Sequence, residues 1–308
     1  MQVAAHAAEL AARHPRVCLA IGFFDGVHLG HQQIIRQTVA DAHQHEAAAV
    51  VVSFDRHPAT VVAPDRVPPL IQTLPQRLRA IKTLGVDGLL LIRFDEAFSR
   101  RTGEEFIRAL ARDFERIFSV CVGATFTFGH RRGGNVALLR TLGRELRFQV
   151  HGLAAVALDG DTVSSTRIRE AIQAGQFDAA GQMLGRGYAL GGEVVEGQRL
   201  GRTLGFPTAN LDTSGLVLPP NGVYAAHAEI NGRSHRAAVN IGVRPTLAGA
   251  PTVVAVEAHL LDFDGDLYGR EMELAFVGKI RDERKFPSLD ALRAQIAKDV
   301  AAARQSFH

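Results

Sequence analysis

The chain is poor in residue types on which several classes of protein depend. It has no tryptophan, three tyrosines and two cysteines in 308 residues, and aromatic residues make up 6% of it. Cys18 and Cys121 both lie in apolar runs, which argues against a disulfide scaffold or a cysteine metal site, and we expect two buried thiols. So few aromatic residues, not interleaved with basic ones, argue against a surface that stacks nucleic-acid bases.

The chain also lacks long apolar runs and is poor in lysine. No stretch has membrane-spanning length, and no basic segment followed by an apolar run opens the sequence. We therefore expect a soluble protein of the reducing cytoplasm with no membrane partner. Lysine occurs four times among 35 basic residues, and the net charge is +3. Arginine suits phosphorylated ligands because its guanidinium offers paired donors, and this composition does not require a nucleic acid.

The first half of the sequence alternates apolar runs of strand length with helical patterns. This alternation predicts a parallel sheet with helices on both faces, whose ligands bind beyond the carboxyl ends of the strands. The predicted helix around 104–112 starts with a capping box at Thr102 and Glu105. The predicted strands are 17–21, 48–53, 88–93, 120–123 and 147–153, and the other predicted helices lie around 34–43, 76–83 and 136–142.

The pattern changes near Gly185, where we place the boundary between a domain of residues 1–185 and one of residues 186–308. The segments 223–230, 234–241, 252–260 and 271–277 alternate polar and apolar residues, which predicts an antiparallel β-barrel. Asn231-Gly232 is a hairpin turn signal between the first two segments. Ser288 begins a terminal helix whose apolar face we expect to pack on the barrel: Leu289, Leu292, Ile296 and Val300.

The segment from Gly22 to His31 predicts a phosphate site. It follows an apolar strand and reads as a tight turn that leads into a helix, whose first N–H groups and dipole attract anions. His28 and His31 add two imidazoles on one side of the loop, and Gly30 leaves room for a phosphate chain against the backbone. Ordinary surface histidines are the alternative in a chain that has 13.

A second segment, 163–169, places hydroxyls before arginines at another helix start. Such groups grip anionic oxygens, although an ordinary helix cap has the same composition. Together with His-x-Gly-His, the segment resembles the paired signature of nucleotidyltransferases, in which the α-phosphate of a nucleoside triphosphate is attacked and pyrophosphate leaves. The resemblance implies catalytic roles for His28 and His31. It implies ATP phosphate contacts for Gly22, Phe24, Asp25, Gly30, Ser165, Thr166 and Arg169.

The hexapeptide Gly205-Phe206-Pro207-Thr208-Ala209-Asn210 follows a basic loop and enters an extended segment. Alternate residues of an extended chain point the same way, so the oxygens of Thr208 and Asn210 converge, and oxygen ligands suit Mg²⁺. A turn with a polar strand end is the alternative. Glu257 lies in an otherwise apolar strand, where it is either a solvated carboxylate or a catalytic base.

These later motifs resemble riboflavin kinase. Joined to the first domain, they are similar to the prokaryotic bifunctional riboflavin kinase/FAD synthetase family over essentially the whole chain. The motifs that carry the resemblance are 184–186, 205–210, 218–224, 240–246, 257–263 and 281–286, with 55–58 and 126–129 in the first domain.

The resemblance implies a Rossmann-like first domain, a kinase barrel and two reactions. Riboflavin is phosphorylated by ATP to FMN, and FMN is adenylylated by ATP to FAD. Glu257 would be the general base, Thr208 and Asn210 would hold Mg²⁺, and Gly201 and Arg202 would contact ATP. The implied flavin-binding residues are Thr125, Asn240, Arg244, Arg281 and Phe286.

Two positions depart from the family's pattern. Phe23 stands where Asn or a small aliphatic residue is common, and Thr125 stands where Asn or Asp is usual and offers a shorter hydrogen-bonding side chain. Two other functions stay open at this point. A monofunctional cytidylyltransferase-like enzyme with an accessory barrel would leave Glu257 unused, and a nucleic-acid-binding barrel would not explain the ordered motifs. The sequence leaves the oligomeric state open.

Overall fold

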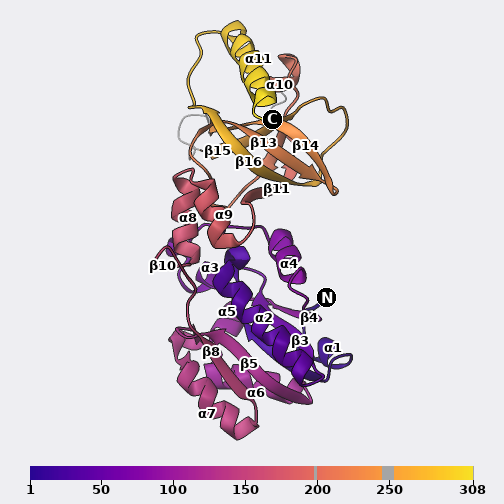
Figure 1. Ribbon diagram of the computed structural model, residues 1–308, viewed down its shortest axis with the longest axis vertical. Coiled ribbons are helices and arrows are strands. Elements are labelled where there is room, and N and C mark those ends of the chain that lie inside the picture. The colour runs from indigo at the N-terminus through magenta and orange to yellow at the C-terminus, as the bar shows by residue number, and fades with distance from the viewer. Residues whose placement is uncertain (198–199, 245–252, 308) are drawn as a thin grey trace. The chain divides into compact units, whose positions relative to one another are not determined.

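The structure is a computed structural model that describes residues 1–197, 200–244 and 253–307. The chain divides into two compact units, one of Met1–Pro69 with Leu74–Ser165 and one of Leu70–Thr73 with Thr166–His308 (Figure 1). The boundary between the two units falls within helix α8 (Ser165–Gln173), so helix α9 (Phe177–Leu184) belongs to the second unit. The boundary between catalytic domains after Gly185 stays a prediction. Within the described ranges, no helix combines the length and apolarity needed to cross a bilayer.

A six-stranded sheet forms the centre of the first unit. Its strand order is β1-β4-β3-β2-β5-β8, and every neighbouring pair is parallel, as predicted. Strand β5 begins earlier than predicted because Ser119, which interrupts its apolar run, is satisfied by Asp41 at 2.6 Å. The strands are β1 (Gln2–Ala4), β2 (Arg16–Ile21), β3 (Ala48–Phe54), β4 (Gly88–Ile92), β5 (Arg116–Gly123) and β8 (Gln149–Leu153).

Both faces of this sheet are buried, as strand β2 shows. Val17, Leu19 and Ile21 join one core cluster, whereas Cys18 and Ala20 join the other. The first cluster is covered by α1 (Ala7–Ala11), α6 (Gly103–Asp113) and α7 (Val136–Leu146), and the second by α2 (Leu29–Gln44) and α4 (Leu74–Lys82). Short helices α3 (Ala59–Val62) and α5 (Glu96–Ser99) follow β3 and β4.

Two local predictions in the first unit are confirmed. The capping box starts α6, where the Glu105 carboxylate accepts from the backbone N–H of Thr102 at 2.8 Å. Cys18 and Cys121 are buried free thiols. Burial raises the pKa of Cys121 to about 12, so this thiol stays protonated at neutral pH.

The order of strands reverses beside β2. From β2 the chain builds outward through β3 and β4 on one side, and it returns to the other side with β5 and β8. In open sheets of this kind, ligands bind at such a reversal, which here lies at the carboxyl ends of β2 and β5. The loop 22–28 leaves β2 at this edge, and the loop 124–126 leaves β5 there. The topology therefore brings the predicted histidine loop and the loop of Thr125 to one edge.

A closed six-stranded barrel forms the second unit, as predicted. Its order is β11-β12-β15-β14-β13-β16, and all neighbours are antiparallel. Asn231 and Gly232 form the hairpin turn with φ of 52° and 73°. The strands are β11 (Ala189–Val195), β12 (Ala209–Asp212), β13 (Gly222–Ile230), β14 (Arg233–Arg244), β15 (Val253–Leu260) and β16 (Glu271–Arg281).

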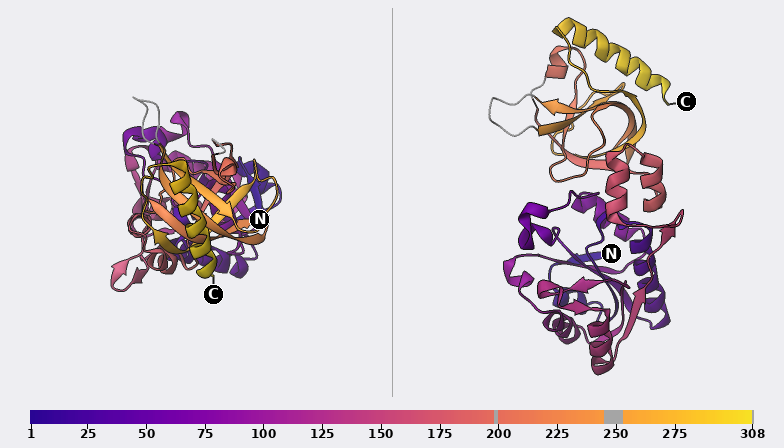
Figure 2. Two further views of the ribbon diagram at one scale, coloured as in Figure 1. Left: turned by 90° about the horizontal axis from the view of Figure 1, so that it is seen from above. Right: turned by 90° about the vertical axis from the view of Figure 1, so that its left-hand side faces the viewer.

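Helix α11 (Leu289–Gln305), drawn in yellow, lies along the barrel (Figure 2). Ser288 caps it by accepting from the N–H of Ala291 at 3.2 Å. Ala303 of this helix packs with Ala225 and Ala238 of the barrel. The predicted packing is therefore confirmed, except that Leu289 in the first turn is 60% exposed and does not join the packed face.

Candidate active sites

The loop after β2 brings the two predicted histidines face to face. His28 caps α2, where its Nδ1 accepts from the backbone N–H of His31 at 3.4 Å. The two imidazole rings stack with centroids 3.6 Å apart. Gly30 leaves room for this arrangement, because a Cβ at that position would press on the His28 ring at 3.2 Å. Two imidazoles and a helix N-terminus thus form one polar surface.

The His31 imidazole is held neutral. Burial and the adjacent His28 ring lower the pKa of His31 well below its ordinary value. Its buried Nδ1 has no hydrogen-bond partner in the described part of the chain. The Phe24 ring lies edge-on to the His31 ring, with the two ring centroids 5.2 Å apart. A neutral imidazole offers one donor and one acceptor. A substrate group at this position would satisfy a nitrogen that the protein leaves unsatisfied.

The rest of the loop is held in a tight conformation. Phe24 has left-handed backbone angles with φ of 58°, and its ring occupies the space that a Cβ at Gly22 would need. Asp25 is 4% exposed, and its backbone carbonyl accepts a hydrogen bond from Ser165 Oγ at 3.1 Å. Ser165 is thus brought to the histidine loop as predicted. Thr166 and Arg169, which follow it in α8, belong to the second unit.

Arg77 of α4 supports this loop, and no motif identified it. It is 4% exposed, and its guanidinium donates to the carbonyls of Phe23, at 3.1 Å, and Phe54. Its Cζ lies 4.4 Å from the centroid of the Phe23 ring. Burial lowers the pKa of Arg77 to about 10, so it remains charged at neutral pH. The departure at Phe23 therefore has a structural role, since an aromatic face stabilises a buried cation.

Thr125 stands in an exposed turn that directly follows β5. The topology brings its loop to the same edge of the sheet as the histidine loop. A side chain in this turn is accessible to a substrate in the crevice, which accords with the flavin contact that the sequence suggests.

In the second unit, strand register places the predicted kinase residues in one row around the barrel. Asn210 of β12 is opposite Glu257 of β15, and Glu257 is opposite Asn240 of β14. The row continues through Val223 of β13 to Arg281 of β16. Directly opposed residues share one face of a sheet. Five motifs that are far apart in the sequence therefore meet at one level of the barrel.

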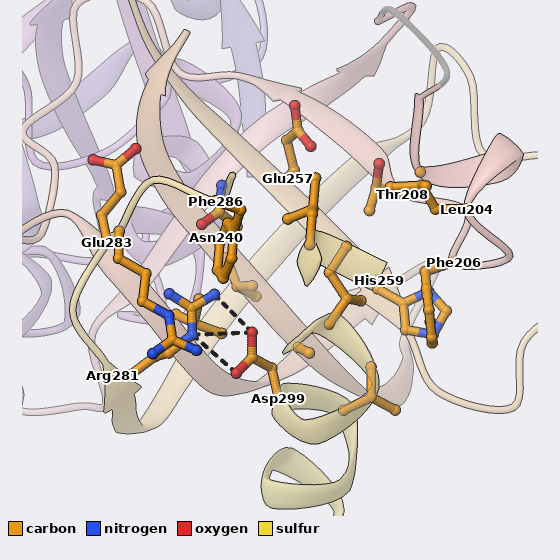
Figure 3. A pocket seen from close by; sticks show the side chains of 18 of the residues that line it. Leu204, Phe206, Thr208, Asn240, Glu257, His259, Arg281, Glu283, Phe286 and Asp299 are labelled. Carbon is orange, nitrogen blue, oxygen red and sulfur yellow. Dashed lines mark hydrogen bonds and ion pairs between the residues drawn. The ribbon is translucent and has the colours of Figure 1, made fainter. Parts of the chain in front are cut away.

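This row lines a cavity of about 340 Å³. Figure 3 shows Glu257 between Asn240 and Thr208, and Phe286 lines the same cavity. Arg244 is the last residue of β14, and its side chain lies outside the part of the structure that is described. The predicted residues that line the cavity are Gly201, Thr208, Asn210, Asn240, Glu257, Arg281 and Phe286.

The predicted metal ligands fit a nucleotide-bound cation. Asn210 is 8% exposed and lies so close to Gly197 that a Cβ there would overlap its amide. A Cβ at Gly201 would lie 3.1 Å from Thr208 Oγ1. Mg²⁺ usually takes one or two protein oxygens and completes its shell with water and phosphate oxygens. The oxygens of Thr208, Asn210 and Glu257 all border the same cavity.

Arg202 lies in a second cavity, of about 630 Å³, rather than in the first. Thr208 borders both cavities. The second cavity also has Phe263, Asp264 and Tyr268 in its wall. The loop 201–208 therefore separates the Glu257 cavity from one that is large enough for another substrate.

Arg281 is engaged by a residue that sequence reasoning missed. Its Nε and Nη2 lie 2.9 and 2.7 Å from the carboxylate of Asp299 in α11 (Figure 3). Asp299 is 5% exposed and also accepts from Gln295 at 2.7 Å. The Arg281 guanidinium lies 5.6 Å from the Phe286 ring. Arg281 thus anchors α11 and the Phe286 segment at the cavity wall. The sequence feature that could have indicated this pair is the position of Asp299 on the otherwise apolar face of the terminal helix.

His259 and Glu283 are further cavity residues without a predicted role. His259 Nδ1 donates to the carbonyl of Pro207 at 2.8 Å and so fixes the loop that carries Thr208. Glu283 accepts from the backbone N–H of Val243 at 3.0 Å and from Asn221 at 2.8 Å. Both residues lie within motifs that the sequence singled out, but nothing in a local pattern names their distant partners.

Comparisons with known proteins match both halves of the chain. A family model described as FAD synthetase matches residues 10–167, and one described as riboflavin kinase matches residues 184–307. A protein of Escherichia coli K12 named bifunctional riboflavin kinase/FMN adenylyltransferase is 38% identical over 292 residues, which is 94% of this chain and 92% of that protein. A protein of the same name from Pseudomonas fluorescens is 39% identical over 290 residues, covering 94% and 93%. A crystal structure from Streptococcus pneumoniae, described as a macrolide-efflux protein, aligns over 94% of each chain with a TM-score of 0.77 and 30% identity.

Proposed function

Since the chain belongs to the bifunctional riboflavin kinase/FMN adenylyltransferase family, we propose that residues 1–185 carry the adenylyltransferase reaction and residues 186–308 the kinase reaction. The enzyme phosphorylates riboflavin with ATP to give FMN and ADP, and it adenylylates FMN with ATP to give FAD and pyrophosphate. The observation that carries the assignment of the kinase site is the single row of Asn210, Glu257 and Asn240 on one cavity. A monofunctional cytidylyltransferase is not favoured, because it would leave this row without a function.

In the kinase reaction, Glu257 acts as the general base. Its carboxylate accepts the proton of the ribityl 5′-hydroxyl as the oxygen bonds to the γ-phosphorus of ATP, and the bond to the β,γ-bridging oxygen breaks to release ADP. Riboflavin occupies the first cavity beside Phe286, and ATP enters from the second, where Arg202 lies. Thr208 and Asn210 would hold Mg²⁺, which supplies neutralisation of phosphate charge.

In the adenylyltransferase reaction, the chain supplies positions and charges rather than a nucleophile. A phosphate oxygen of FMN bonds to the α-phosphorus of ATP, and pyrophosphate leaves without a covalent enzyme intermediate. His28, His31 and the N-terminus of α2 stabilise the phosphates, because their N–H donors are fixed before the substrate arrives. Gly22, Phe24, Asp25, Gly30 and Ser165 shape the loop, and Thr166, Arg169 and Thr125 complete the proposed contacts.

The substrates and products are therefore riboflavin, FMN, FAD and ATP, with Mg²⁺ accompanying the nucleotide. Neither a nucleic acid nor a membrane is a proposed partner. The use of ATP and the two free thiols, Cys18 and Cys121, support a cytoplasmic location.

One experiment tests the whole proposal. The purified chain is incubated with riboflavin, ATP and Mg²⁺, and the flavins are separated by chromatography over time. We expect FMN to form first and FAD to follow, and EDTA to stop both steps. Conversion that ends at FMN would contradict the adenylyltransferase assignment. Consumption of CTP with no change in the flavins would favour the cytidylyltransferase instead.

A further inference from the structure

The segment that follows Thr125 contains two adjacent arginines that the proposed reactions do not use. Arg131 and Arg132 are exposed, and both have left-handed backbone angles, with φ of 52° and 56°. Residues other than glycine rarely adopt this backbone conformation, and two such residues in succession are rarer still. Such strain persists only where the surroundings fix the backbone, and it concentrates at ligand sites.

The surroundings do fix this backbone. Strands β6 (Thr127–Phe128) and β7 (Gly134–Asn135) pair across its two ends. Between them, the His130 N–H donates to the Arg101 carbonyl at 2.7 Å, and His130 Nδ1 donates to the Ser99 carbonyl at 3.1 Å. A Cβ at Gly129 would lie 2.3 Å from the nitrogen of Gly103, so the loop is pressed against the start of α6. The two arginines are presented on a rigid loop.

The two arginines are also electrostatically uncompensated. The backbone N–H of Arg132 donates to the carbonyl of Gly129 at 3.0 Å, but neither arginine side chain makes an ion pair or hydrogen bond within the described part of the chain. Adjacent like charges repel each other, and a bound anion removes that repulsion. Several other arginines of the unit are engaged by the chain itself: Arg56 by Asp55, Arg77 by two carbonyls, Arg100 by Glu96, Arg108 by Glu104 and Glu145, and Arg112 by Asp113.

The position of the loop indicates which anion it meets. The segment 124–135 leaves β5 at the edge of the sheet where the histidine loop leaves β2. Adenylylation brings two anions together at this edge, and the histidines with the α2 N-terminus already serve the ATP phosphates. On the β5 side, Thr125 is the proposed flavin contact. We propose that Arg131 and Arg132 form the subsite for the 5′-phosphate of FMN. This inference rests on the proposed adenylyltransferase function.

The test compares the double variant Arg131→Gln/Arg132→Gln with Arg147→Gln. Arg147 is a matched control because it is exposed, has φ of 61° and lies at the opposite edge of the sheet, before β8. Initial rates of FAD formation give the KM of FMN and of ATP separately. We expect the double variant to raise the KM of FMN about 10- to 100-fold, since hydrogen bonds to charged groups are strong. The KM of ATP, riboflavin phosphorylation and the unfolding temperature stay unchanged, and the double lysine variant retains most of the FMN affinity.

Three results would overturn the inference: a KM of FMN as low as in Arg147→Gln, a rise confined to the KM of ATP, or an equal loss of kinase activity in a folded variant. If the glutamine pair does not fold, Arg131→Gly/Arg132→Gly removes the charges while relieving the left-handed strain, and the same outcomes apply. Failure of the unchanged chain to make FAD would instead refute the proposed function.

Discussion

Arg281 of β16 and Asp299 of α11 form a bidentate ion pair at the wall of the kinase cavity, with the guanidinium Nη2 2.7 Å from Oδ2. The side chains are 19% and 6% exposed, so water screens the pair only weakly. The pair ties the terminal helix to the strand that continues into the Phe286 segment. Its loss should therefore affect both stability and the kinase site.

Arg281→Met is expected to lower the free energy of unfolding by about 3–5 kcal/mol, because it leaves the Asp299 carboxylate buried without its cation. Asp299→Asn should cost less, since an amide oxygen still accepts from the guanidinium. Urea denaturation measures both, with Lys298→Gln on the exposed side of α11 as the control. The KM of riboflavin should rise in parallel while FMN adenylylation is retained. An Arg281→Met variant as stable as the control would show that the pair contributes nothing.

Glu257→Gln should remove kinase activity with little loss of stability. The amide keeps the shape of the side chain in β15 but cannot accept the substrate proton, and loss of a general base typically costs about 10²–10⁴ in rate. ADP release in the presence of riboflavin measures this step, and nucleotide binding should be retained. Glu193→Gln in β11, an exposed position outside both cavities, is the control. A Glu257→Gln rate close to that of the control would exclude this carboxylate as the base.

His28→Ala and His31→Ala should each remove most FMN-to-FAD conversion and leave riboflavin phosphorylation near normal. The two rings lie in the first unit, whereas every residue that lines the Glu257 cavity belongs to the second unit. His43→Ala, an exposed change in the last turn of the same helix, controls for effects on α2. Chromatography of the flavins separates the two activities. Parallel loss of both in a variant with an intact circular dichroism spectrum would refute the division of labour.

The lowered pKa of His31 makes the first unit sensitive to acid. In the unfolded chain this imidazole takes up a proton near its ordinary pKa of 6.5, whereas the folded protein resists protonation until a much lower pH. The unfolded state therefore binds more protons in that interval, and stability falls as the pH drops below 6.5. The slope from this residue is at most about 1.4 kcal/mol per pH unit.

His31→Gln should remove that part of the pH dependence. Urea unfolding of the parent and the variant, compared between about pH 7 and pH 5, measures the contribution of His31 together with its coupling to His28, because the other titrating groups are common to both. The difference in free energy of unfolding between the two proteins should shift in favour of the variant as the pH falls. A difference that stays constant across this range would mean that the folded state protonates His31 as readily as the unfolded chain does.

The sequence predicted features that depend on neighbours along the chain. Apolar runs located β2, β3 and β4 within a residue at each end, and Asn231-Gly232 located the hairpin. Strands β1 and β12 were not predicted, because they have three and four residues, too few for an alternation of polar and apolar side chains to be recognised. In β11, Gly191-Gly192 interrupts the alternation of side chains.

Motifs located the candidate sites, but not the residues that hold them in place. Thr208, Asn210 and Glu257 belong to short patterns that can be read directly. Arg77 and Asp299 do not, because each acts on groups that only the fold brings near: the carbonyls that follow β2 and β3, and a guanidinium of β16. The one sequence departure that the structure explains, Phe23, is explained by Arg77, a residue 54 positions away.

Thr125→Asn tests the other departure. The family usually has an amide or carboxylate here, and this chain offers a hydroxyl with shorter reach in an exposed turn beside Phe126. If the hydroxyl does not reach the substrate, the amide should restore one hydrogen bond worth about 0.5–1.5 kcal/mol and raise the efficiency of FAD formation. If the hydroxyl already bonds through a water molecule, the change should be nearly neutral. In both cases FMN formation from riboflavin is unchanged, since the barrel is untouched. Steady-state rates of the two steps decide between these outcomes, with Thr127→Asn, an exposed change in β6, as the control. A steep loss of adenylylation confined to Thr125→Asn would contradict both cases. It would mean that the crevice is shaped around the smaller side chain, and the Phe23–Arg77 contact would then be the compensating difference to test next.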